Sequence, residues 1–99
     1  MVSAPGGENL NGFVVIFVTR RNCPLCAKAE PLVSTWVRRL GGRVRTVSIE
    51  GNPSLAQEFG TRTPVVIAPT GDVVAEGNIG RAALIVGLAK ARLVQMIRT

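Results

Sequence analysis

The chain contains no histidine and no tyrosine, and only two of its 99 residues are cysteine. Two cysteines cannot build a disulfide-rich scaffold, and without histidine they fall short of the four ligands of a structural zinc site. No run approaches the roughly 20 apolar residues that a membrane-spanning helix needs. A secretory signal begins with basic residues, whereas residues 1–12 have no basic side chain. We therefore expect a cytoplasmic protein that makes no contact with a membrane.

Acidic residues are scarce as well, because six acids face twelve lysines and arginines and the net charge is +6. An excess of this size makes nucleic-acid binding an alternative. The arginines are dispersed along the chain, however, and most of the four aromatic residues are expected in the core. No platform for stacking bases is visible. The pattern therefore favours a solvated basic surface, with some preference for acidic partners, over a nucleic-acid interface.

The most informative segment of the chain is Cys23-Pro24-Leu25-Cys26. It follows the apolar run at residues 13–18 and opens a segment with helical periodicity. Two sulfurs separated by two residues on a first helical turn can join as a disulfide or separate as a dithiol. We expect Cys23 to cap this helix and Pro24 to be its first residue. Free N–H groups and the positive end of the helix dipole then favour the nucleophilic thiolate.

Glycine and proline residues divide the remaining chain into short apolar segments. Residues 1–12 lack periodicity and predict a flexible tail, so that residues 13–99 form one domain. The predicted order is β-α-β-α-β-β-α. Strands are expected at residues 13–18, 43–49, 64–68 and 72–76, and helices at 24–40, 52–60 and 80–98.

The last predicted helix contains more apolar residues than one face can hold. Its spacing predicts a buried stripe that leaves Leu84 and Leu88 outside, and the alternatives for these two are a wider core contact or a weak dimer patch. The stripe consists of Ala82, Ile85, Val86, Ala89, Leu93, Met96 and Ile97.

Four local features follow one another in this order. They are the Cys23–Cys26 motif, Pro31 inside the next helix, the segment Gly60–Val65, and the segment Glu76–Gly80 before the last helix. Together they resemble the thioredoxin superfamily, in the minimal form of a glutaredoxin-like or small thioredoxin-like protein. The resemblance implies an α/β thioredoxin-like fold, whose four-stranded mixed sheet has helices on both faces.

The motifs depart from the family pattern at four places. Leu25 stands where glutaredoxins usually have tyrosine, and residues 78–81 lack the paired acids that hold the amino end of glutathione. Phe17 occupies the place of the buried acid of thioredoxins, and Asn22 that of the aromatic residue before the first cysteine. The resemblance therefore leaves open whether glutathione or a thioredoxin-reductase-like protein is the reductant.

The resemblance also assigns roles to individual residues. Cys23 and Cys26 are the expected catalytic pair, with Arg20, Thr63 and Pro64 as substrate-binding residues. The Thr63–Pro64 bond is expected to be cis, against the alternative of a trans proline that begins an edge strand. Four residues are expected to lower the pKa of the Cys23 thiol, namely Arg20, Arg21, Pro24 and Leu25.

For both arginines, a solvated strand end is the alternative interpretation. For Glu30 and Glu58, the alternatives are proton transfer from Cys26 and simple surface solvation.

The expected function is thiol–disulfide oxidoreductase activity through Cys23 and Cys26. A structural bridge would gain little, because a disulfide stabilises less when it closes a short loop. We expect a monomer that needs no metal and no organic cofactor, with glutathione as a possible co-substrate. Its partners would be protein or small-molecule disulfides and a thiol reductant. Two alternatives stay open: a noncatalytic partner-binding module, and a dimeric metal or iron–sulfur carrier.

Overall fold

Three helices and four strands follow one another in the computed structural model, which describes residues 12–98. The expected tail at residues 1–12 therefore lies outside the described residues except for Gly12. The elements are β1 (Val14–Thr19), α1 (Pro24–Arg39), β2 (Arg43–Ser48), α2 (Pro53–Phe59), β3 (Val65–Ile67), β4 (Val73–Glu76) and α3 (Arg81–Arg98). The order predicted from the sequence is confirmed, and each predicted boundary lies within two residues of the observed one.

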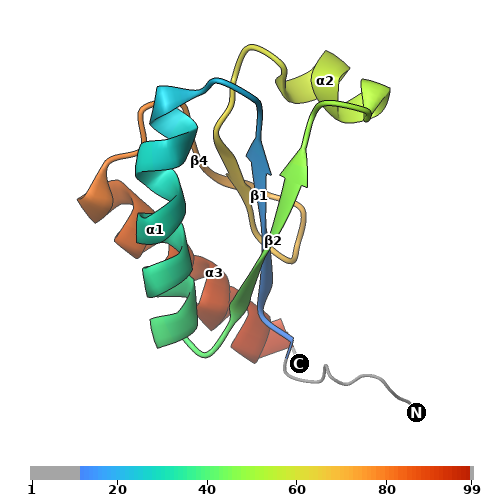
Figure 1. Ribbon diagram of the computed structural model, residues 1–99. Helices are drawn as coiled ribbons and strands as arrows, with labels where there is room; N and C mark the ends of the chain where they lie inside the picture. The colour runs from blue at the N-terminus through green and yellow to red at the C-terminus, as the bar shows by residue number, and fades with distance from the viewer. Residues whose placement is uncertain (1–11, 99) are drawn as a thin grey trace.

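The four strands form one mixed sheet in the order β2-β1-β3-β4. β1 pairs in parallel with β2 and antiparallel with β3, so it is a central strand between two neighbours. Val18 lies opposite Val65, which brings the carboxyl end of β1 beside the amino end of β3. The two segments that hold the sequence-predicted site therefore leave the sheet at the same end (Figure 1).

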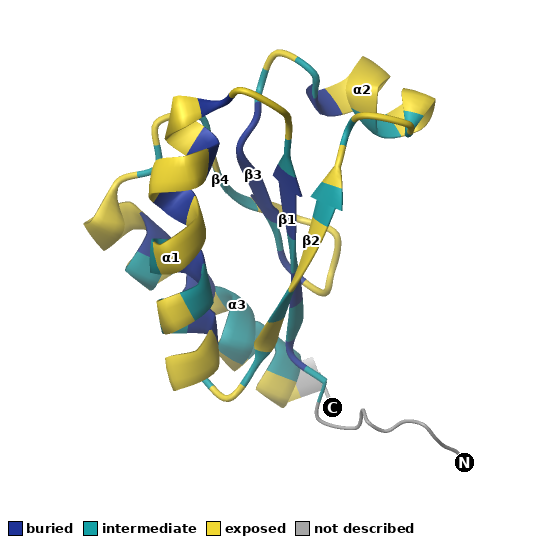
Figure 2. Cartoon of the chain, in the orientation of Figure 1, coloured by how far each residue is buried: buried dark blue, intermediate teal, exposed yellow. Residues whose placement is uncertain are grey.

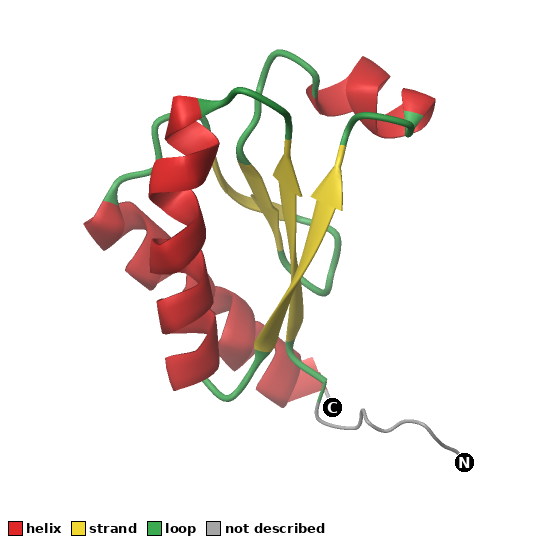
Figure 3. Ribbon diagram, viewed as in Figure 1, coloured by secondary structure: helices red, strands yellow, loops and turns green. Residues whose placement is uncertain are grey.

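Helices lie on both faces of the sheet, as Figure 3 shows. α1 and α3 cover one face, and the core between them and the sheet includes Phe13, Phe17, Leu84 and Leu88. α2 packs on the other face, where Phe59 joins Val18 and Val65 in a smaller cluster. The buried residues line the sheet and the inner sides of the helices in Figure 2. The α/β thioredoxin-like fold expected from the sequence is thus confirmed.

α3 packs with a different face from the one that its periodicity predicted. Leu84 and Leu88 are fully buried, whereas Val86 is 67% exposed and Ile97 is 74% exposed. The physical reason lies at Gly87, where a Cβ atom would come within 2.7 Å of the Val74 Cγ1 atom in β4. This close approach fixes which side of α3 meets the sheet, and Leu84 and Leu88 are buried on that side.

Within residues 12–98, none of the helices combines the length and the apolar character that crossing a membrane requires.

Candidate functional site

The first turn of α1 holds both cysteines. Asn22 has a positive φ of 54°, which turns the chain out of the loop after β1, and Cys23 follows in an extended conformation. Cys23 is the N-cap, and its Sγ atom accepts a hydrogen bond from the Cys26 N–H at 3.1 Å. Pro24 has no N–H to leave unpaired, which suits the first helical position. The local structure predicted from the motif is confirmed.

Cys23 and Cys26 are joined as a disulfide, with their Cα atoms 5.2 Å apart. Both are largely buried, Cys23 at 9% exposure and Cys26 at 3%. The cysteine at the cap is therefore the more accessible of the two, and the one inside the helix is the more enclosed.

A shallow groove of about 610 Å³ opens beside the disulfide, and we call it the cysteine groove. Eight residues line it: Thr19, Arg20, Asn22, Cys23, Pro24, Cys26, Ala27 and Glu30. Arg20 is thus brought to the sulfurs, and Glu30 contributes an acid to the same lining. Glu58, the other acid considered for proton transfer, is exposed on α2.

Arg21 does not line the cysteine groove, unlike its neighbour Arg20. Its backbone N–H is hydrogen-bonded to the Glu50 carboxylate, with N–O distances of 3.1 and 3.2 Å. The hydrogen bonds from the Ser48 hydroxyl and the Arg21 N–H hold the pKa of Glu50 below its ordinary value of 4.5. Sequence reasoning missed Glu50. Because β1 and β2 are parallel, the loops that follow them lie side by side, and Glu50 is in the second of these loops. A prediction of this pairing would have pointed to Glu50.

The Thr63–Pro64 peptide bond is cis, as the resemblance implied. Thr63 is buried at 7% exposure, and its hydroxyl has no hydrogen-bond partner among residues 12–98. The Thr63 backbone N–H and C=O also make no hydrogen bond within those residues. An extended chain that reached this point would therefore find unpaired backbone groups to bind.

An ion pair that the sequence did not predict joins this segment to β4. The Arg62 Nε atom lies 2.6 Å from Glu76 Oε1, and its Nη2 atom lies 3.2 Å from Oε2. The hydrogen bond from Arg62 lowers the pKa of Glu76 below 4.5. The Gly77 N–H donates to the Pro64 carbonyl at 2.9 Å. Together these contacts tie the cis peptide segment to the end of β4.

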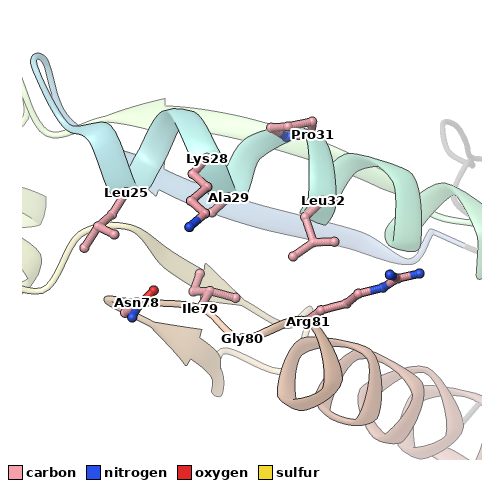
Figure 4. Close-up of a pocket in the computed structure, with 9 residues that line it drawn as sticks. All are labelled: Leu25, Lys28, Ala29, Pro31, Leu32, Asn78, Ile79, Gly80 and Arg81. Atoms are coloured by element: carbon pink, nitrogen blue, oxygen red, sulfur yellow. The ribbon is translucent and has the colours of Figure 1, made fainter.

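Leu25 faces a second groove, which we call the Leu25 groove. It lies between α1 and the segment that leads into α3 (Figure 4). Its lining consists of Leu25, Lys28, Ala29, Pro31, Leu32, Asn78, Ile79, Gly80 and Arg81. The first turn of α1 therefore separates two grooves, one at the sulfurs and one on the α3 side.

Two thiols are the metal-ligating groups that the motif brings together. Within residues 12–98, no three side chains of the His, Cys, Asp or Glu type gather where they could hold a metal ion. A four-thiolate site would therefore need a second copy of the chain.

The sequence pattern described as "Glutaredoxin-like domain (DUF836)" matches residues 14–95, from β1 to the last turns of α3. The chain belongs to this family. The match includes both cysteines, both grooves and the Thr63–Pro64 segment, so the glutaredoxin-like assignment rests on the whole fold rather than on the cysteine motif alone. A comparison with the curated proteins finds no match.

Solved structures of similar proteins support the same fold. The X-ray structure of the structural genomics target protein XcR50 from X. campestris has a TM-score of 0.66 and 24% identity, and covers 77% of this chain and 96% of its own. Thioredoxin 1 from the thermophilic eubacterium Thermosipho africanus has a TM-score of 0.63 and 17% identity, and covers 87% of this chain and 99% of its own. At these identities the likeness establishes the thioredoxin-like fold.

Proposed function

We propose that this glutaredoxin-like protein catalyses thiol–disulfide exchange, with Cys23 as the attacking thiol and Cys26 as the resolving thiol. The observation that carries the proposal is the capped disulfide at the start of α1. Cys23 Sγ is bonded to Cys26 and also accepts the Cys26 N–H. The same N–H would stabilise negative charge on Cys23 Sγ once the disulfide is reduced.

The reaction begins with the reduced protein. The Cys23 thiolate attacks one sulfur of the substrate disulfide, whose S–S bond breaks as a Cys23–substrate bond forms, and the first substrate thiolate leaves and takes up a proton. Cys26 then loses its proton and attacks Cys23 Sγ, which releases the second substrate thiol. The substrate gains two electrons, the protein becomes the Cys23–Cys26 disulfide, and an external thiol reductant restores the dithiol.

Accessibility supports the assignment of the two roles. Cys23 is more exposed than Cys26 and lies at the cap, where the free N–H groups of the helix favour a thiolate. Arg20 shares the cysteine groove and adds a positive charge there. The unpaired backbone groups of Thr63 suit an extended substrate segment, which would pair with them as an added strand.

The proposal is tested by two serine variants in a disulfide-reduction assay with dithiothreitol as the electron source. Cys23→Ser should lose at least 100-fold in turnover, because no nucleophile remains at the cap. Cys26→Ser, reduced beforehand and mixed with the substrate disulfide after dithiothreitol is removed, should accumulate a mixed disulfide, which mass spectrometry detects as the added mass of one half of the substrate. Arg45→Ala, on an exposed position of β2, is the control and should keep wild-type turnover.

Alkylation provides an independent measurement of the roles. Iodoacetamide at neutral pH should label Cys23 of the reduced protein faster than Cys26. Faster labelling of Cys26 would reverse the assignment, and a wild-type protein without any turnover would instead favour a noncatalytic binding module.

A further inference from the structure

The Leu25 groove lies beside the cysteines, but the exchange reaction itself does not use it. Its volume is about 610 Å³, the same as that of the cysteine groove, and neither cysteine lines it. Figure 4 shows Leu25 and Asn78 at one end of the groove and Leu32 and Arg81 at the other, with Lys28 extending from α1 toward the opposite wall. A substrate held at the cysteines could therefore continue past Leu25 into this groove.

The walls of the groove are apolar and its charges are of one sign. Leu25, Leu32 and Ile79 give apolar surface, whereas Lys28 and Arg81 are the charged residues of the lining, which contains no acid. Within residues 12–98, neither cation has an ion-pair or hydrogen-bond partner. Two uncompensated cations above apolar walls are complementary to a segment that carries both apolar and acidic side chains.

The cysteine groove on the other side of the α1 N-terminus has a different balance. There Glu30 lines the same groove as Arg20, so both signs of charge are present. The net preference for negative charge is therefore confined to the α3 side of the site.

We infer that the Leu25 groove selects protein disulfides in which an acidic residue lies close in sequence to the reacting cysteine, with apolar residues between. This inference rests on the proposed function, because it concerns the substrate of the same cysteines. Leu25 and Leu32 are separated by two turns of α1, a rise of about 10 Å. An extended chain covers that length in about three residues, which places the acid within about four residues of the substrate cysteine.

The size of the effect follows from the exposure of the cations. An exposed ion pair contributes about 0.7 kcal/mol, which is a factor of about three in binding. Two such pairs give a preference of roughly tenfold for an acidic segment, and salt should weaken it because exposed charges are screened.

The test uses three synthetic peptide disulfides, each a symmetrical dimer of a short peptide with one cysteine. The peptides are identical except at the third residue on each side of the cysteine, which is Glu, Gln or Lys. Dithiothreitol supplies the electrons, and kcat/KM is measured in 20 mM and 500 mM NaCl. We expect the Glu peptide to be reduced about tenfold more efficiently than the Lys peptide at low salt, with a smaller ratio at high salt.

The variant pair Lys28→Glu/Arg81→Glu should reverse this order, and Lys28→Gln/Arg81→Gln should remove it. Arg45→Glu/Lys90→Glu is the matched control. It changes the net charge equally, but neither residue lines the Leu25 groove or the cysteine groove. The control should keep the wild-type preference.

The outcomes separate the two claims. Cys23-dependent turnover without any preference among the peptides would leave the proposed function standing and overturn the inference. An equal loss of preference in the control would also overturn it, because the whole-molecule charge would then be responsible. No turnover of any peptide would contradict the proposed function itself.

Discussion

Asn22 is the residue at which the chain turns toward the capped cysteine. Its φ of 54° lies in the left-handed region, where it is the one residue other than glycine among residues 12–98. Asparagine tolerates this conformation better than other residues with a Cβ atom, because its short side chain can hydrogen-bond locally. Thioredoxins have an aromatic residue at this position, whereas this chain has an asparagine, which suits a left-handed turn.

The first prediction concerns this turn. Asn22→Gly should change the free energy of unfolding little, because glycine adopts positive φ without strain. Asn22→Val should cost about 1–2 kcal/mol, since a β-branched side chain is poorly accommodated there. Urea denaturation of the oxidised protein measures both, and equal stability of the two variants would show that the turn relaxes without cost.

The two arginines before Asn22 differ in what they contact, although both were expected to lower the pKa of the Cys23 thiol. Arg20 lines the groove that holds Cys23, whereas the backbone of Arg21 is bound to Glu50. Arg20→Ala should therefore slow the alkylation of Cys23 at pH 6–7 by about two- to threefold at low salt, because an exposed charge contributes less than about 1 kcal/mol. Arg21→Ala is the matched control and should alter the rate less. A larger effect of Arg21→Ala would mean that its side chain, rather than that of Arg20, acts on the thiolate.

At the level of elements, the segment that contains Pro64 depends on β4 for its position. Arg62 is ion-paired with Glu76, and the Pro64 carbonyl is bound by Gly77. Glu76 is not among the residues that line either groove, so we consider it a positioning residue.

Glu76→Gln should therefore affect substrate binding more than stability. The free energy of unfolding should change by less than about 1 kcal/mol, because the two side chains are exposed and a surface ion pair is weak. KM for a peptide disulfide should rise about two- to fivefold with kcat nearly unchanged, since Thr63 would be held less firmly. Asp72→Asn removes the same charge from the β3–β4 turn and is the control. Unchanged KM in Glu76→Gln would remove the positioning role.

Local signals in the sequence predicted most of the helices and strands. The cap at Cys23 and the proline after it are recognisable within four residues, and the predicted strands lie close to the observed ones. The face of α3 was predicted wrongly, because both sides of that helix are apolar and its periodicity alone does not choose between them. Gly87 carried the missing signal, since a glycine inside a helix indicates a close approach.

The contacts around the site were not predictable in the same way. Arg62 and Glu76 are far apart in sequence, and they meet because Val65 lies opposite Glu76 in the sheet. Glu50 reaches the loop before Cys23 through the pairing of β1 with β2. Strand register decides both contacts, and a single sequence does not show register.

On the scale of the whole molecule, the absence of histidine simplifies the dependence of stability on pH. In the oxidised protein the cysteines do not titrate, and Glu50 and Glu76 have pKa values lowered by their hydrogen bonds in the folded state. A carboxylate with a lowered pKa adds stability above its unfolded value of about 4.5, and that stability is lost as the pH falls through the lower folded value.

The free energy of unfolding should therefore be nearly constant from pH 5.5 to 7 and decrease below pH 4.5. Urea denaturation at a series of pH values measures the curve. Glu50→Gln/Glu76→Gln should flatten its acidic limb, and the difference should shrink in 500 mM NaCl because both carboxylates are exposed. An acidic limb of unchanged slope would assign the loss of stability to other acids.

The outward side of α3 has a consequence for the behaviour of the protein in concentrated solution. Val86, Leu93 and Ile97 are exposed there, on a helix whose charged residues are all basic. At low ionic strength, the net charge of +6 keeps molecules apart over a Debye length of about 30 Å in 10 mM salt. In 1 M salt that length falls to about 3 Å, and short-range attraction between apolar surfaces dominates. The osmotic second virial coefficient should thus change from positive to negative as salt is added, so the protein would be stored best in dilute buffer and crystallised most readily from concentrated salt.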